Sequence, residues 1–190
     1  MSDKISIPLS IIVAGLLIGG GFYLNGRNKI NNQNSLGASS IVQEQIKQAA
    51  NIRPVDANDH ILGNPSAPVV IIEYSDTECP FCKEFHKTMR ALMTEYGNKG
   101  NLAWVYRHFP FEELHPKALK EAEALECVGE LGGNSKFWEY TNRLYEVTPS
   151  NNDIDPKELT NIAKQVGLSS DKFNTCLESG QYAPRVKTDV

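Results

Sequence analysis

Two cysteines separated by two residues, Cys79 and Cys82, form the group in this sequence best suited to chemistry. They follow an apolar run and open a segment with helical spacing, in which Pro80 suits the first turn. Unpaired N–H groups and the helix dipole at that position favour the thiolate of Cys79, the nucleophile in disulfide exchange. Cys82, one turn later, can close a disulfide with Cys79 or resolve a mixed disulfide. The spacing predicts thiol–disulfide chemistry.

Other kinds of site are less well supported. A zinc site needs about four ligands with tetrahedral spacing, but Cys127 and Cys176 are widely separated and there is no second C-x-x-C pair. His86 follows Cys82 by four residues and is expected to point elsewhere. The sequence has no phosphate-binding glycine loop, and its formal net charge of -4 gives no reason to expect a nucleic-acid partner. We therefore expect no metal and no organic cofactor.

The elements that would position the cysteine pair can be predicted from the pattern around it. Residues 69–72 form a continuous apolar run, which predicts a strand buried on both faces. The helix that opens at Pro80 is followed by a second strand over 102–109, rich in aromatic and β-branched residues. This β–α–β unit implies a parallel strand pair with a right-handed crossover. Helical segments are predicted to follow, from Pro116, over 137–147, from Pro156 to a stop at Gly167, and over 170–179.

The N-terminal segment predicts a membrane anchor. Residues 5–26 contain no charged side chain, and a helix of that length would cross a bilayer. A cleaved signal peptide is the alternative, although the segment is long for one. Residues 27–57, rich in Asn, Gln and Ser, predict a flexible polar linker. Arg27 and Lys29 after the span weigh against export of the C-terminal part, whereas the cysteine chemistry favours a catalytic domain on the extracytoplasmic side of the membrane.

Seven short motifs occur in order along the second part of the chain: Gly63-Asn64-Pro65-Ser66-Ala67-Pro68, Ile72-Glu73-Tyr74-Ser75-Asp76, Glu78-Cys79-Pro80-Phe81-Cys82, His108-Phe109-Pro110, His115-Pro116, Phe137-Trp138-Glu139 and Phe173-Asn174-Thr175-Cys176-Leu177-Glu178-Ser179-Gly180. In type and order, these motifs resemble the DsbA-like branch of the thioredoxin superfamily. The resemblance covers about residues 58–190. It implies an α/β thioredoxin-like fold, with a β–α–β core over 58–112 and a helical insertion over 113–190.

The resemblance also implies roles for individual residues. Cys79 and Cys82 match the redox-active pair, with Pro80 and Phe81 between them. Glu73 matches an acidic residue of the family and would accept a proton from the buried thiol; a solvated edge residue is the alternative. The sequence departs from the family in two ways. Phe81 stands where some strongly oxidising relatives have histidine, and the final strands and cis-proline loop are predicted to be missing from this chain.

The second cysteine pair has two interpretations. In an oxidising compartment, a structural disulfide between Cys127 and Cys176 would staple the helical region, and the resemblance supports a second pair in some relatives. The alternative is two buried free thiols that pack as small apolar groups.

Together these features predict a membrane-tethered protein thiol:disulfide oxidoreductase. The first interpretation is oxidation of cysteine pairs in exported proteins, with a membrane redox protein that recycles the Cys79–Cys82 disulfide. A tethered disulfide reductase, for example in cytochrome maturation, is the alternative in the same class. A thioredoxin-scaffold binding module without turnover is the alternative in another class.

Overall fold

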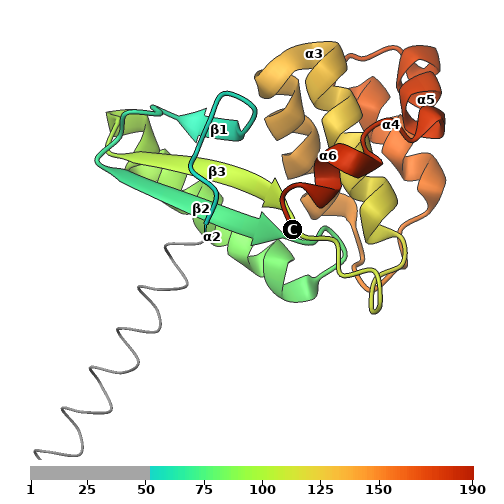
Figure 1. Ribbon diagram of the computed structural model, residues 1–190, viewed down its shortest axis with the longest axis horizontal. Helices are drawn as coiled ribbons and strands as arrows, with labels where there is room; N and C mark the ends of the chain where they lie inside the picture. Colours follow the sequence, from blue (N-terminus) through green and yellow to red (C-terminus); the bar gives the residue numbers. More distant parts are fainter. Residues whose placement is uncertain (1–51) are drawn as a thin grey trace, which may run out of the picture. The chain divides into compact units, whose positions relative to one another are not determined.

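The computed structural model describes residues 52–190, and residues 55–190 form one compact unit. A three-stranded sheet has the order β1-β3-β2, in which β1 is antiparallel and β2 parallel to the central β3 (Figure 1). The strands and helices in chain order are β1 (His60–Gly63), β2 (Val69–Ser75), α2 (Pro80–Glu95), the short 3₁₀ helix η1 (Gly97–Lys99), β3 (Leu102–His108), α3 (Ala118–Val147), α4 (Pro156–Gln165), α5 (Ser170–Ser179) and α6 (Ala183–Lys187).

The central strand is the buried one. All seven residues of β3 are buried, whereas β2 lies at an edge and exposes Val69 and Val70 by 52% and 41%. The prediction that residues 69–72 are buried on both faces is therefore wrong. An apolar run is compatible with either position, and only the pairing partners decide which strand becomes central. β1 was not predicted, since its four residues carry too little pattern.

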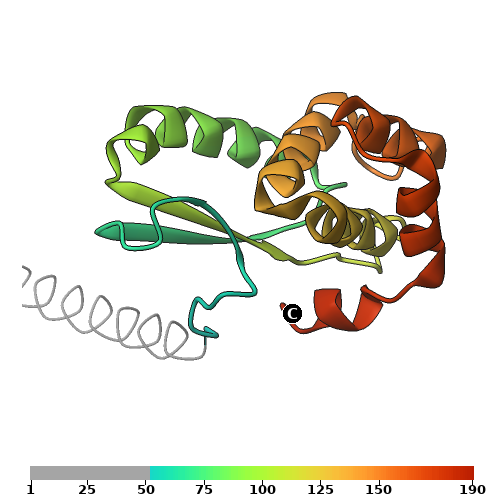
Figure 2. The ribbon, with the colours of Figure 1, turned by 90° about the horizontal axis from the view of Figure 1, so that it is seen from above.

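Helix α2 connects the two parallel strands and packs along one face of the sheet (Figure 2). It begins at Pro80, with Cys79 as its N-cap residue in an extended conformation. The buried side of α2 carries His86, Met89 and Met93. The helix start therefore lies at the carboxyl end of β2, where the sequence placed the cysteine pair.

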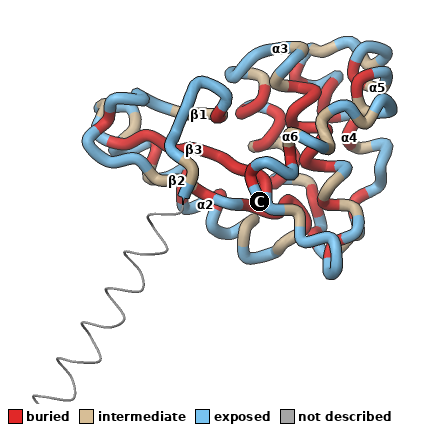
Figure 3. Tube along the Cα trace, viewed as in Figure 1, coloured by how far each residue is buried: buried red, intermediate tan, exposed pale blue. Residues whose placement is uncertain are grey.

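The remaining helices gather beyond the carboxyl ends of β2 and β3, and their buried residues face one another (Figures 1 and 3). α3 contains both of the helical segments that were predicted, from Pro116 and over 137–147, joined across a break in the helix. Gly133 breaks it with φ 75° and ψ −179°, a conformation that suits glycine. α4 begins as predicted, with the Asp155 carboxylate accepting the N–H of Lys157.

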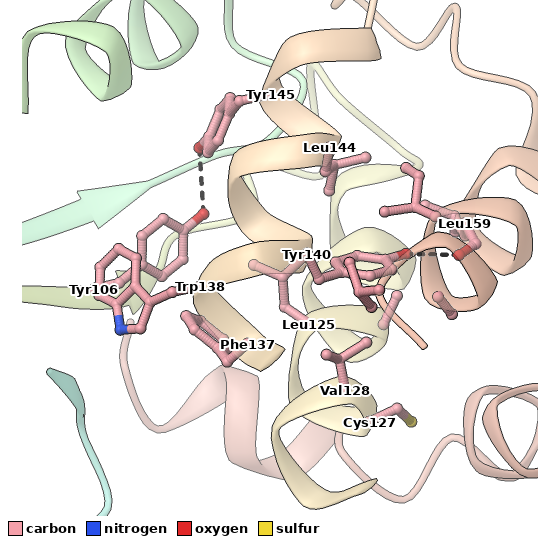
Figure 4. Packing of buried hydrophobic residues seen from close by; sticks show 14 of the residues in the cluster. Tyr106, Leu125, Cys127, Val128, Phe137, Trp138, Tyr140, Leu144, Tyr145 and Leu159 are labelled. Carbon is pink, nitrogen blue, oxygen red and sulfur yellow. Dashed lines mark hydrogen bonds between the residues drawn. The ribbon is translucent and has the colours of Figure 1, made fainter. Parts of the chain in front are cut away.

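One aromatic core joins the sheet to the helices. Trp104 and Tyr106 of β3 pack against Phe137 and Trp138 of α3, with ring centroids between 4.6 and 6.1 Å apart for the three contacting pairs. Deeper among the helices, the buried hydroxyl of Tyr140 donates to the carbonyl of Leu159 at 3.0 Å (Figure 4). Because aromatic rings bury large areas, this core fixes the helical segment against the strand that lies beside the cysteine pair.

A disulfide joins Cys127 of α3 to Cys176 of α5, with the Cα atoms 5.9 Å apart. Both residues are buried in the helical part of the core. The alternative of two free thiols at these positions does not describe this structure.

Replacing both cysteines, Cys127→Ala with Cys176→Ala, is expected to lower the free energy of unfolding by about 2–4 kcal/mol, because the bond closes a loop of 49 residues in the unfolded chain. Urea denaturation of the full chain measures the loss. A change in the free energy of unfolding below about 0.5 kcal/mol would contradict a stabilising role for the disulfide, since ordinary surface substitutions have effects of that size.

None of the helices within residues 52–190 is long and apolar enough to cross a membrane. The predicted anchor over residues 5–26 and most of the predicted linker over 27–57 lie outside the described part of the chain.

Candidate active site

The two cysteines lie at the junction of β2 and α2. The N–H of Cys79 donates to the carbonyl of Asp76 at 3.2 Å, and the Cys79 carbonyl accepts the N–H of Lys83 at 3.1 Å, which begins the helix. Both thiols are free and partly buried. Phe81 between them is 83% exposed. The free N–H end of the helix thus faces Cys79, while an apolar side chain stands in solvent beside it.

Cys82 points to the protein interior. Burial raises the pKa of its thiol to about 11, a shift opposed by hydrogen bonding from the backbone of Asp76 and from Ser75, and reinforced by Cys79. Because this thiol holds its proton at neutral pH, Cys82 would need a proton whenever it is released from a disulfide. The two cysteines therefore have different surroundings: one is at the helix end, and the other is above the buried end of the sheet.

A network of buried hydroxyls lies beneath Cys82. The Ser75 and Tyr145 hydroxyls are 2.8 Å apart. The Tyr145 and Tyr106 hydroxyls are 3.2 Å apart, a contact that Figure 4 shows. Each hydroxyl can both donate and accept, so the network can reorient around a thiol or a thiolate. These residues were not predicted to belong to the site, because Tyr145 reaches Ser75 across 70 positions of the chain.

Glu73 is part of the same buried region. It is only 5% exposed, and its Oε2 accepts the indole N–H of Trp104 at 2.8 Å, while Oε1 has no hydrogen-bond partner among the described residues. Burial raises the pKa of this carboxyl, opposed by hydrogen bonds from Ser75 and Trp104. Glu73 is therefore not a solvated residue at the sheet edge, which was the alternative interpretation. Ser75 lies close enough to both Glu73 and Cys82 to influence the pKa of each.

His86 adds a neutral imidazole to this region. Its Nε2 lies 2.8 Å from Oδ1 of Asn142, and its ring stacks on Tyr145 with centroids 4.4 Å apart. Burial lowers the pKa of His86 to about 4. The residue is therefore a component of the core on the inner side of α2, and within residues 52–190 there is no group of three or more His, Cys, Asp or Glu able to hold a metal ion.

His86 is expected to make the protein less stable in mild acid. Its pKa falls from 6.5 to about 4 on folding, so the unfolded chain binds the proton more tightly and stability is lost as pH falls from about 6.5 towards 4. The full loss is up to about 3 kcal/mol. His86→Gln should flatten this part of the pH profile of unfolding.

Glu126 provides the internal comparison for that measurement. Burial would raise its pKa, but His108 and His60, 2.9 and 3.0 Å from its Oε1, hold the pKa well below the usual 4.5. The contribution of the Glu126 carboxylate to stability is lost only as pH falls below about 4.5. Equal slopes for the wild type and His86→Gln between pH 6.5 and 4.5 would contradict the assignment to His86.

The described residues form a thioredoxin-type dithiol protein, with a C-x-x-C pair at the start of a helix that follows a parallel strand. A thioredoxin family model matches residues 56–190, so the chain belongs to that family. The predicted thioredoxin-like α/β fold with added helices is confirmed, and so is the resemblance to DsbA-like proteins.

Solved structures of bacterial DsbA-like proteins share this fold. BdbD from Bacillus subtilis has a TM-score of 0.64 and 24% identity, over 72% of this chain and 75% of that one. Wolbachia pipientis alpha-DsbA1 has a TM-score of 0.60 and 26% identity, over 72% and 67% of the two chains.

The match to curated relatives covers only part of the length of each relative. The Na(+)/H(+) antiporter NhaA 1 of Salinispora arenicola is 35% identical over 138 residues, which are 72% of this chain and 20% of the antiporter. The chain thus spans about a fifth of the length of such relatives. A Rickettsia typhi protein, provisionally named a protein-disulfide oxidoreductase, is 28% identical over 166 residues, or 80% of this chain and 56% of that one.

Proposed function

We propose that this protein is a thiol:disulfide oxidoreductase that oxidises cysteine pairs of exported proteins from the extracytoplasmic side of a membrane. The observation that carries the proposal is the unequal environment of the two cysteines. Cys79 lies at the N-terminus of α2 beside an exposed Phe81, and Cys82 lies over the buried Ser75 and Glu73. Its DsbA-like relatives in solved structures support the same chemistry.

In the oxidising direction, a substrate thiolate attacks the Cys79 sulfur of the Cys79–Cys82 disulfide. A mixed disulfide forms between the substrate and Cys79, and Cys82 leaves with the electron pair of the broken S–S bond. Cys82 then takes a proton, a step in which we assign the delivery to Glu73, a carboxyl near Ser75 whose pKa is raised by burial.

A second substrate thiolate completes the reaction. It attacks the substrate sulfur of the mixed disulfide and releases Cys79 as the leaving thiolate. The substrate has then lost two electrons and the protein has gained them. A membrane redox protein would remove these electrons, and the anchor over residues 5–26 would keep the two proteins close together.

The test is a glutathione redox titration of the full chain, with alkylation and mass analysis of Cys79 and Cys82. An apparent potential near or above roughly −200 mV is expected for a protein that donates its disulfide. A value near roughly −270 mV or below would instead support the reductase alternative. After reduction of intact cells, alkylation with a membrane-impermeant thiol reagent tests the extracytoplasmic location, because only an exported Cys79 would react.

A further inference from the structure

Glu78, the residue directly before Cys79, has a fully buried side chain. Its carbonyl accepts the N–H of Asn151 at 2.9 Å, and its Oε2 accepts the N–H of Asn152. Its other oxygen, Oε1, has no hydrogen-bond partner among the described residues. Burial of an unsatisfied carboxyl oxygen is costly, so a donor is expected at Oε1.

The loop that contacts Glu78 has an unusual backbone. Ser150, Asn151 and Asn152 have φ values of 68°, 55° and 66°, so three consecutive non-glycine residues adopt the left-handed conformation. Each such residue is uncommon and carries an energetic cost, which the surrounding contacts must offset. Lys83 on α2 also donates to this loop, at the carbonyl of Thr148. The loop is thus attached to the chain on both sides of the cysteine pair.

The missing donor lies on α3. Glu121 is 1% exposed, and neither of its carboxyl oxygens has a partner with hydrogen-bond geometry in residues 52–190, yet the side chain lies beside Glu78 and Thr77. Two buried carboxyl groups side by side do not both ionise. Burial, and then Glu78, raises the pKa of Glu121 to about 9, so Glu121 is protonated at neutral pH and its O–H can donate to Glu78.

Other charged groups do not replace this arrangement. Asp76 also faces Glu121, but its Oδ2 already accepts the N–H of Phe111 and lies 2.9 Å from Nδ1 of His115. Tyr140 approaches Glu121 from the same helix, and its hydroxyl donates to Leu159. Neither residue supplies the donor that Glu78 lacks.

We propose that Glu78 and Glu121 share one proton. The pair then carries one negative charge beside Cys79, and not two. It also holds the turn before Cys79 against the loop of Ser150, Asn151 and Asn152. Glu121 is a positioning residue in this arrangement, because it acts through Glu78. The inference rests on the proposed function for its redox consequence: a second buried charge would disfavour the Cys79 thiolate and therefore the reduced protein.

The shared proton can be observed without any redox activity. Infrared spectra of the full chain at neutral pH are expected to contain the carbonyl stretch of a protonated carboxylic acid, part of which disappears in Glu121→Gln. Glu123→Gln on the same helix, whose carboxylate pairs with Lys120 at 2.9 Å, is the matched control and should leave the band unchanged. Identical spectra for the wild type and Glu121→Gln would overturn the proposal.

The effect on Cys79 is measured by the equilibrium constant with glutathione. Glu78→Gln keeps an acceptor for Asn152 and removes the charge, so it should favour the reduced protein by about tenfold. Glu84→Gln removes a charge from the exposed face of α2 and should change the constant less than about threefold, because water screens exposed charges. Equal constants for the two variants would overturn the redox role of the pair. If the wild type and all variants equilibrate only at the uncatalysed rate, the proposed function fails, while the infrared result still decides whether the proton is shared.

Discussion

Cys79→Ser is expected to reduce disulfide exchange to the uncatalysed rate, whereas Cys82→Ser is expected to accumulate a mixed disulfide with the substrate at Cys79. The two outcomes differ because Cys79 lies at the exposed helix start and Cys82 points toward Ser75. Without Cys82, no neighbouring thiol attacks the mixed disulfide, so the covalent complex is released only by external thiols.

The experiment follows oxidation of a dithiol peptide by the pre-oxidised protein, with mass analysis of trapped adducts. Because the serine variants cannot carry the Cys79–Cys82 disulfide, they are presented with the peptide in its disulfide form. The double variant Cys127→Ala with Cys176→Ala is the control and should exchange at nearly the wild-type rate, since that pair lies in α3 and α5. Wild-type exchange by Cys79→Ser would refute the catalytic assignment and favour a binding module.

Asp59→Asn is expected to lower the free energy of unfolding by about 3–5 kcal/mol, because it leaves the guanidinium of Arg107 buried without its charge partner. The pair is bidentate: Nε and one Nη of Arg107 donate to the two carboxylate oxygens at 2.9 and 3.0 Å, and both side chains are 0% exposed. Asp59 holds the pKa of Arg107 above its usual value, and Tyr74 accepts from the other Nη at 2.9 Å.

Urea denaturation of the full chain measures this loss, and a double replacement separates its causes. Asp59→Leu with Arg107→Met should recover much of the stability, because neither member of the pair then remains buried without the other. Glu146→Gln, which removes the exposed partner of Arg90, is the control and should cost less than about 1 kcal/mol. Equal losses for Asp59→Asn and Glu146→Gln would show that the buried pair contributes no more than a surface one.

Local signals allowed the helices around the site to be predicted. Pro80 at the start of α2 and the Asp155-Pro156 pair before α4 act within one turn of the chain, so their effects are visible in the sequence. The kink at Gly133 also has a local cause, but a single glycine does not distinguish a kink from a helix end.

Features that depend on distant partners could not be predicted. β1 is a strand because it pairs with β3, forty or more residues away, and Val69 and Val70 of β2 are exposed because this strand lies at the edge of the sheet. Glu121 interrupts the apolar pattern of its helix, and its burial makes sense only beside Glu78, on another element. The candidate site was located by Cys79 and Cys82, whereas its buried polar surroundings come from tertiary contacts.

The disulfide between α3 and α5 has a consequence for the order in which the chain folds. The segment that it closes contains only helices, whose contacts are local, whereas β1 can pair with β3 only after the intervening β2 and α2 have been brought together. Local contacts form faster than distant strand pairings. We therefore expect Cys127 and Cys176 to be joined before the sheet is complete, which leaves Cys79 and Cys82 as the remaining thiols and reduces the chance of incorrect cysteine pairing during folding.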